Sequence, residues 1–274
     1  MKENKSTHHK NNKNNERRER QMQGESRATP AEGVVSGRNA VRELLASGRD
    51  IDKIFVARGD REGSIVALVG EVLARKIPLV ETDRKRLDTL CGHNHHQGIV
   101  AQAAERAYST VEDILACAEE RGEKPLVVIA DEIEDPHNLG ALIRCAECSG
   151  VHGIIIPKRR AVGLTAAVAK SSAGAIEHMR VAKVANIAST VELLKEKGLW
   201  IYAADMDGSP YYGTDLRGAA AIVLGSEGFG ISRLVKEKCD FVVSIPLYGQ
   251  VNSLNVSTAA AVILCEAAKQ RHGS

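Results

Sequence analysis

Residues 126–150 read LVVIADEIEDPHNLGALIRCAECSG, a pattern of strand, turn and helix. The apolar residues Leu126–Ala130 are typical of a strand that is buried on both faces. Pro136, Asn138 and Gly140 then indicate a tight turn into a helix, whose first backbone N–H groups point outward. Ligands of open α/β sheets bind at this edge, where strands end. We therefore expect part of a binding site directly after residue 130.

Four further apolar runs follow along the chain, with helical patterns between them. They are Gly153–Ile156, Trp200–Ala204, Ala220–Leu224 and Phe241–Ile245, and a strong helix is expected at Val256–Arg271. Runs without polar alternation are typical of parallel strands that helices cover on both sides. Hydrophobic residues make up 43% of the chain but aromatic ones only 3%, so Val, Ile, Leu and Ala must fill the core. We predict an α/β domain with a parallel sheet over residues 125–274.

The front part of the chain predicts a smaller α/β domain over residues 33–104. Helices are expected at Ser36–Leu45, Ile65–Lys76 and Arg84–Cys91, with strands at Ile51–Ala57, Pro78–Glu81 and Gly98–Ala103. Residues 105–124 are expected to be a linker with one helix. Residues 1–32 are polar and lack apolar periodicity, which predicts a disordered basic tail, either an arm for RNA or a solvated leader.

The net charge of +2 is unevenly distributed along the chain. Residues 1–30 contain eight Lys/Arg and four Asp/Glu, whereas the rest contains 29 and 31. Any RNA contact outside the tail therefore needs a local basic patch. No apolar run is long enough to span a bilayer and the start of the chain is polar, so we expect a cytoplasmic protein without membrane contact.

The six cysteines are expected to be reduced thiols in that compartment. Cys145 and Cys148 form a C-x-x-C within a predicted helix, without a second pair or nearby histidine ligands. We interpret them as small buried residues rather than as a zinc or redox site, and we expect no metal.

Two more polar segments follow buried strands. In IVLGSEGFG, residues 222–230, Gly225 lets a ligand approach the backbone and Glu227 emerges at the sheet edge. The glycine spacing does not fit the dinucleotide fingerprint, and such a loop can also be a simple turn. In IPLYGQVNSLNVST, residues 245–258, five neutral polar residues precede a helix: Asn252, Ser253, Asn255, Ser257 and Thr258. Helix capping explains one of them, not five.

These segments carry three motifs in order. They are N-x-G-x-x-x-R (Asn138, Gly140, Arg144), L-G-x-E-G (Leu224–Gly228) and I-P-x-x-G-x-x-x-S-L-N-V-S-x-A (Ile245–Ala259). In this order they resemble the motifs of the SpoU/TrmH family of methyltransferases, and they cover most of residues 125–271. The front part resembles the family's substrate-binding domain, with G-R-N-A-V at residues 37–41 and H-Q-G-I-V-A at residues 96–101.

The resemblance implies an RNA ribose 2'-O-methyltransferase that uses S-adenosyl-L-methionine, contains a trefoil knot in its C-terminal domain and forms its active site as a homodimer. The most similar subgroup is the bacterial enzymes that methylate a guanosine ribose in 23S ribosomal RNA. A transfer-RNA enzyme of the same family and a non-catalytic RNA-binding homologue are the alternatives. The residues implied for the cofactor are Leu224, Gly225, Ile245, Ser253 and Leu254, and those for catalysis are Arg144, Glu227, Asn138, Ser253 and Asn255.

Arg144 carries the chemical part of this interpretation. A guanidinium can bind the neighbouring phosphate with two hydrogen bonds and stabilise negative charge that grows on the ribose 2'-oxygen. It is always protonated, so action as a base would need an exceptional environment or proton transfer through the substrate phosphate. The alternative to a catalytic role is a surface arginine that forms an ion pair with Glu147.

RNA recognition by the front domain is expected to rest on unstacked bases and phosphates. The candidates are Arg38, Asn39, Arg42 and His96, together with Arg84, Lys85, Arg86 and the loop His93–His96. For these histidines a metal site and a solvated loop are the alternatives.

Overall fold

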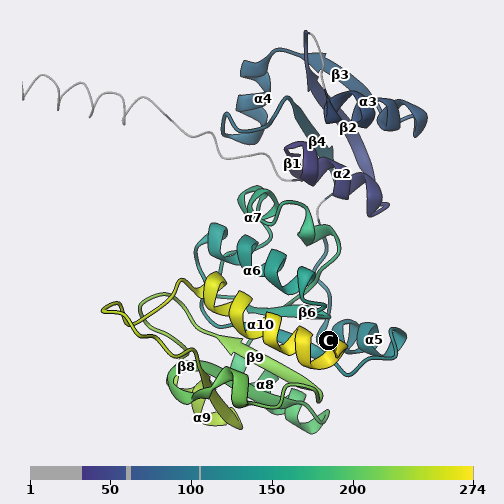
Figure 1. Cartoon of the computed structure of the whole chain (residues 1–274). Coiled ribbons are helices and arrows are strands. Elements are labelled where there is room, and N and C mark those ends of the chain that lie inside the picture. The colour runs from purple at the N-terminus through teal and green to yellow at the C-terminus, as the bar shows by residue number, and fades with distance from the viewer. Residues whose placement is uncertain (1–32, 60–62, 105, 274) are drawn as a thin grey trace, which may run out of the picture.

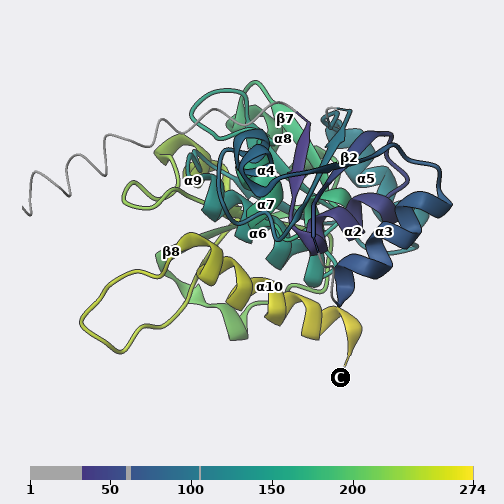
Figure 2. The same cartoon turned by 90° about the horizontal axis from the view of Figure 1, so that it is seen from above.

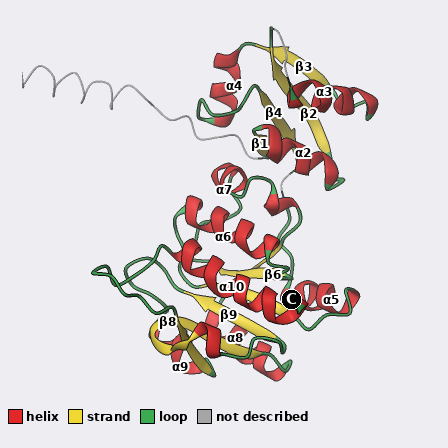
Figure 3. Ribbon diagram, viewed as in Figure 1, coloured by secondary structure: helices red, strands yellow, loops and turns green. Residues whose placement is uncertain are grey.

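The computed structural model describes residues 33–59, 63–104 and 106–273, and these residues form two sheets with helices on both sides (Figure 1). In Figure 3 the yellow strands of each part lie between red helices. The predicted α/β class is confirmed. The predicted tail, residues 1–32, lies outside the described residues.

The first sheet has four strands in the order β1-β4-β2-β3, where only β2 and β3 pair in parallel. Its strands are β1 (Val34–Ser36), β2 (Ile51–Ala57), β3 (Leu79–Thr82) and β4 (Ile99–Ala103). Alternate residues of β2 point to opposite faces: Ile54 and Val56 pack under α2 (Arg38–Ala46) and α3 (Ser64–Ala74), Phe55 and Ala57 under α4 (Arg84–Cys91). Burial on both faces explains the apolar run of this strand.

The start of the first helix differs from its prediction. Ser36 belongs to strand β1, and Gly37, with φ of 100°, precedes α2 without a side-chain cap. Glycine adopts such a positive φ at little cost, so the chain can turn from strand to helix within one residue.

The second sheet has six parallel strands in the order β10-β8-β9-β5-β6-β7. Its strands are β5 (Leu126–Ala130), β6 (Gly153–Pro157), β7 (Arg180–Val184), β8 (Trp200–Pro210), β9 (Ala220–Leu224) and β10 (Phe241–Ser244). One face is covered by α6 (Pro136–Cys148), α7 (Ala166–Ser171) and α10 (Val256–His272), the other by α5 (Val111–Glu120), α8 (Ile187–Glu196) and α9 (Arg233–Lys238). The trefoil knot stays a prediction.

Strand β7 was not predicted from the sequence. Its residues RVAKV contain two cations that interrupt the apolar run. Among the described residues, β6 is its one neighbouring strand, and Ser109 alone forms a bridge, to Ala182, on its other side. Edge strands tolerate charged side chains because one side of the strand is largely unpaired. The five predicted apolar runs are the five strands from β6 to the opposite edge of the sheet.

The two parts meet through a buried carboxylate. The side chain of Glu177, only 1% exposed, accepts hydrogen bonds from Arg49 of the front part at 2.9 Å and from Arg106 of the connecting segment at 3.0 Å. Beside it, His178 Nε2 lies 2.8 Å from Glu43 Oε2. In Figure 2, seen from above, the front part therefore lies over the α6 and α7 side of the second sheet.

Candidate active site

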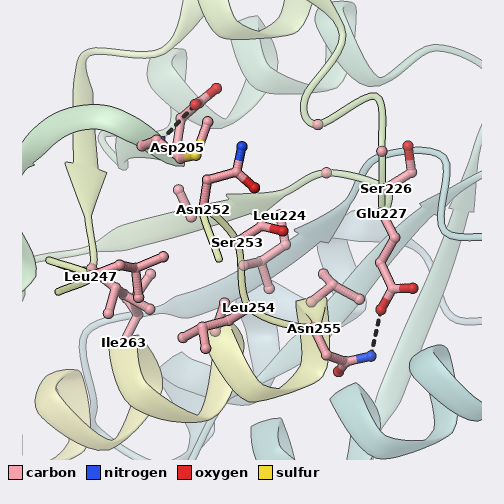
Figure 4. Close-up of a pocket in the computed structure, with 18 of the residues that line it drawn as sticks. Asp205, Leu224, Ser226, Glu227, Leu247, Asn252, Ser253, Leu254, Asn255 and Ile263 are labelled. Atoms are coloured by element: carbon pink, nitrogen blue, oxygen red, sulfur yellow. Dashed lines mark hydrogen bonds between the residues drawn. The ribbon is translucent and has the colours of Figure 1, made fainter. Parts of the chain in front are cut away.

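A cavity of about 680 Å³ lies beside the middle of β8, at the ends of β9 and β10 and at the start of α10. Apolar side chains line its inner part, among them Leu224, Val243 and Ile263, and polar ones line its rim (Figure 4). The structure brings all five residues implied for the cofactor to this cavity: Leu224, Gly225, Ile245, Ser253 and Leu254. Their role in holding a cofactor stays a prediction.

The loop after β9 presents Glu227 at the mouth of the cavity. Ser226 and Gly230 exchange two backbone hydrogen bonds, of 3.1 and 2.9 Å, which close a small loop around Glu227. Gly225 packs so closely under this loop that a Cβ atom would lie 2.0 Å from the carbonyl carbon of Gly230. Glycine at position 225 is thus required for the loop itself.

The segment Leu247–Leu254 forms a wall of the cavity and is exposed along its length. Its backbone N–H and C=O groups form no hydrogen bond with other residues in the described part of the chain. Backbone groups of folded proteins are almost always paired, with protein, water or a ligand. This segment therefore offers a row of free donors and acceptors to whatever enters the cavity.

Asn255 joins three segments that are far apart in the sequence. Its Oδ1 caps α10 by accepting hydrogen bonds from the backbone N–H groups of Ser257 and Thr258. Its Nδ2 donates to Asn138 Oδ1 at 2.8 Å, at the start of α6. It also donates to Glu227 Oε1, as Figure 4 shows. One side chain thus does two things: it caps a helix, and it holds a polar cluster of Asn138, Glu227 and Asn255 at the sheet edge.

Arg144 is not part of this cluster. It is exposed on α6, lines neither this cavity nor its neighbour, and forms no hydrogen bond or ion pair with residues 33–59, 63–104 or 106–273. The alternative interpretation, a pair with Glu147, is therefore wrong for this structure. A single protomer leaves the guanidinium unpartnered on its outer surface.

A second cavity of about 480 Å³, which the sequence does not predict, adjoins the first. It is lined by Glu132, Ile133, Glu134, Asp135, Asn138, Arg160, Ser226, Glu227, Phe229 and Val256. The run of acidic residues directly after β5 was the available signal, because it had to lie at the carboxyl edge of the sheet.

The candidate RNA-binding residues of the front part differ in accessibility. Asn39 and Arg42 are exposed, with Arg42 Nη1 3.4 Å from Asn39 Oδ1, and the basic residues 84–86 of α4 are exposed as well. Arg38 is half-buried, and its Nε donates to the carbonyl oxygen of Gln97 at 3.2 Å. An RNA contact by these residues stays a prediction.

His96 does not fit its predicted role as an RNA contact. Its side chain is 2% exposed, Nδ1 accepts a hydrogen bond from the backbone N–H of Gly98 at 2.9 Å, and Nε2 lies 3.1 Å from Asp88 Oδ1. Burial lowers the pKa of His96. A neutral, enclosed ring supports the loop rather than reaching a ligand.

The prediction that the two cysteines of the C-x-x-C pair are buried is only partly right. Cys145 is half-buried and Cys148 is exposed, both as free thiols, and burial raises the pKa of Cys145. Within the described residues no three His, Cys, Asp or Glu side chains gather as they would around a metal ion. Nor do these residues include a helix with the length and apolar character needed to cross a membrane.

A parallel sheet with a ligand-sized cavity at the ends of its strands, and a polar cluster beside it, defines an α/β protein that binds a small molecule at its carboxyl edge. Residues 125–265 match the model of the SpoU rRNA Methylase family, and residues 34–109 match that of RNA 2'-O ribose methyltransferase substrate binding. YacO of Bacillus subtilis (strain 168), named as a TrmH family tRNA/rRNA methyltransferase, is 44% identical over 239 residues, which cover 87% of this chain and 96% of YacO.

Solved structures of such methyltransferases have a fold similar to that of this chain. An RNA 2'-O ribose methyltransferase is 25% identical, with a TM-score of 0.73 over 87% of this chain and 88% of that chain. The SpoU methyltransferase AviRb from Streptomyces viridochromogenes, solved in complex with AdoMet, has a TM-score of 0.73 at 22% identity over 88% and 91%. The chain belongs to the SpoU/TrmH family of RNA 2'-O-methyltransferases, and the predicted enzyme class is confirmed.

Proposed function

We propose that this chain, as a homodimer, transfers a methyl group from S-adenosyl-L-methionine to the ribose 2'-hydroxyl of a guanosine in 23S ribosomal RNA. The observation that carries the proposal is the larger cavity with the cluster of Asn138, Glu227 and Asn255 at its mouth. Family membership supports the reaction, and the AdoMet held by AviRb supports the cofactor.

The residues of the larger cavity fit this cofactor. Its volume of about 680 Å³ lies within the usual range for small-molecule sites, about 300–1,000 Å³. The apolar side chains that line the cavity, among them Leu224, Ile245 and Leu254, suit an adenine ring, whose edge needs hydrogen bonds. The free backbone groups of Leu247–Leu254 can form them, since they have no other partner within the described chain.

When bound, the cofactor supplies a methyl group on a sulfonium: the new bond joins the methyl carbon to the ribose 2'-oxygen, while the C–S electron pair stays on sulfur. The protein must then place the 2'-hydroxyl in line and stabilise the oxygen as its proton leaves to water or to the substrate phosphate. Asn255 holds both Glu227 and Asn138 at the boundary where this oxygen would lie, because its Nδ2 donates to each of them. Arg144 would supply the positive charge.

The exposed position of Arg144 supports a homodimer. Small residues surround it on α6, namely Ala141, Cys145 and Cys148, and α10 packs beside α6 on the same face of the sheet (Figure 1). Small side chains permit close helix packing between two copies. In a two-fold dimer formed by this face, Arg144 of one protomer acts at the cavity of the other.

Mixing two inactive variants tests this arrangement. Arg144→Ala and Asn255→Ala protomers, denatured and refolded together in equal amounts, would give about half heterodimers by random pairing. If Arg144 acts across the interface, each heterodimer contains one intact site, and the mixture recovers about a quarter of wild-type activity. If Arg144 acts within its own protomer, both sites of the heterodimer are defective and no activity returns.

The substrate is tested separately from the cofactor. Calorimetry should detect binding of S-adenosyl-L-methionine, and a labelled methyl group should pass to 23S ribosomal RNA but not to transfer RNA. Transfer to transfer RNA alone would establish the alternative substrate, which the tRNA/rRNA name of YacO keeps open. Cofactor binding without transfer to either RNA would favour a non-catalytic RNA-binding protein. Mapping ribose methylation in cells that lack the gene would identify the nucleotide. The cytoplasmic location stays a prediction.

A further inference from the structure

The smaller cavity lies on the other side of the polar cluster from the larger one. The two cavities share Ser226, Glu227 and Val256 as a common wall, and the smaller one is also lined by Asn138. A methyl donor and its acceptor must approach to about 3–3.5 Å before transfer. If the larger cavity holds the donor, the adjoining one is in the right place for the acceptor nucleotide.

An exposed aromatic ring forms part of the wall of the smaller cavity. Phe229 is 93% exposed and lines this cavity but not the larger one. Of the three phenylalanines, Phe55 is buried and Phe241 stacks on Tyr202, whereas Phe229 has no ring contact among the described residues. Unpaired bases are commonly bound by stacking on such a ring.

One of the carboxylates in this cavity is free to recognise a base. Asp135 caps α6 by accepting a hydrogen bond from the N–H of His137 at 2.6 Å, and Glu132 pairs with Arg160 at 3.1 Å. Glu134 is exposed and forms no hydrogen bond or ion pair within the described residues. A carboxylate accepts two parallel hydrogen bonds, which matches the adjacent N1–H and N2–H donors of guanine. Uracil instead presents one N–H between two oxygens, which a carboxylate repels.

Basic residues at the same edge of the sheet offset these carboxylates. Lys158 and Arg159 follow β6 directly, and Arg160, which lines the smaller cavity, pairs with Glu132; all three are exposed. Arginine and lysine bind the phosphates of a nucleic acid without reading its sequence. The edge therefore combines a stacking ring, a base acceptor and a phosphate site, which are the three parts that a flipped nucleotide needs.

We infer that the smaller cavity binds the target nucleotide, with its base stacked on Phe229 and a guanine edge paired with Glu134. This inference rests on the proposed function, because it places the acceptor beside the cofactor cavity. The ribose 2'-hydroxyl then faces Glu227 and Asn138 in the wall between the two cavities.

Nucleotide binding can be measured without methyl transfer, so a failure of this inference is distinguishable from a failure of the proposed function. We would titrate the full-length protein with guanosine 5'-monophosphate and uridine 5'-monophosphate by calorimetry. The guanine nucleotide should bind more tightly than the uracil nucleotide. Phe229→Ala should weaken both by about ten-fold, equal to about 1.4 kcal/mol, whereas Phe229→Tyr keeps the ring and the affinity.

Glu134→Gln tests base selection. The expected result is loss of the preference for guanine, since an amide cannot accept from both N–H groups. Glu196→Gln is the matched control, because Glu196 is exposed as well, lines neither cavity and has no hydrogen bond within the described residues. Equal binding of the two nucleotides by the wild type, or unchanged affinity in Phe229→Ala, would overturn the inference. So would a change of oligomeric state in Phe229→Ala by ultracentrifugation with nucleotide affinity retained, because Phe229 would then belong to a protein interface.

Discussion

Asn255 allows helix capping to be separated from the proposed organisation of the active site by two substitutions at one position. Asn255→Ala removes both functions of the side chain. Loss of the cap costs about 1 kcal/mol, and loss of the two bonds donated from Nδ2, which are exposed, adds up to about 1 kcal/mol. For a protein of this size, a total of about 1–2 kcal/mol lowers Tm by about 2–8 °C.

Asn255→Asp retains the cap and loses only the amide donor. A carboxylate still accepts from the N–H groups of Ser257 and Thr258, and its charge at a helix N-terminus is favourable by about 0.3–1 kcal/mol. Repulsion from Glu227 costs about 1 kcal/mol in water at 4 Å, so the net change in stability is near zero. Methyl transfer should nevertheless fall about 100-fold, because Glu227 and Asn138 lose the group that holds them together.

Thermal unfolding by circular dichroism and single-turnover methyl transfer would measure the two effects separately. Thr110→Ala is the control for loss of a cap away from the site, because Thr110 caps α5 by accepting from the N–H of Asp113 at 3.1 Å. It should lower Tm as Asn255→Ala does and leave the rate unchanged. Wild-type turnover in Asn255→Asp, or a loss of stability equal to that of Asn255→Ala, would refute the reasoning.

Three further predictions concern other parts of the molecule. Arg144→Ala should abolish methyl transfer while calorimetry still detects cofactor binding; wild-type-like turnover would remove Arg144 from the mechanism. Glu177→Gln should destabilise the protein by about 3–5 kcal/mol in urea unfolding, because two part-buried guanidinium groups lose their counter-charge; a change below 1 kcal/mol would mean that water replaces the carboxylate. Burial lowers the pKa of His152 from its ordinary value of 6.5, so the unfolded chain binds a proton at this residue more readily than the folded one. The free energy of unfolding should therefore fall as the pH drops below about 6.5. His152→Gln should flatten that dependence in a series of melting curves, and an unchanged slope would assign it to other groups.

The pH prediction has a structural basis at the start of the central strand. His152 is 1% exposed, its Nδ1 accepts a hydrogen bond from the backbone N–H of Leu126 at 3.0 Å, and its Nε2 lies 3.0 Å from Glu123 Oε2. Protonation of Nδ1 would remove the acceptor of a buried backbone donor at the first residue of β5. Such a donor without a partner costs about 1–3 kcal/mol.

The parts of the fold that could be predicted from the sequence were those set by local patterns. Leu126–Ala130 and Ala220–Leu224 are strands with the predicted bounds. A short, continuous apolar run is typical of a strand that is buried on both faces. Strand β7 was not predicted because two cations interrupt its apolar run. These cations fit its place at the sheet edge, and the order of strands in the sheet cannot be derived from any local segment. His96 differs from its prediction for a similar reason: its ring nitrogens contact Asp88 of α4 and the backbone of Gly98, and the sequence pattern does not show these contacts.

The site shows the same division between local and long-range information. Each polar segment was predictable alone, because polar residues directly after a buried strand must lie at the edge of the sheet. The contact of Asn255 with Asn138, 117 residues away, was not, because it requires α6 and α10 to lie side by side. Without that contact, capping was a sufficient explanation for Asn255. With it, the same amide both begins α10 and holds Glu227 in the wall between the two cavities. Any rearrangement of α10 against α6 must therefore also move the place where we propose that donor and acceptor meet.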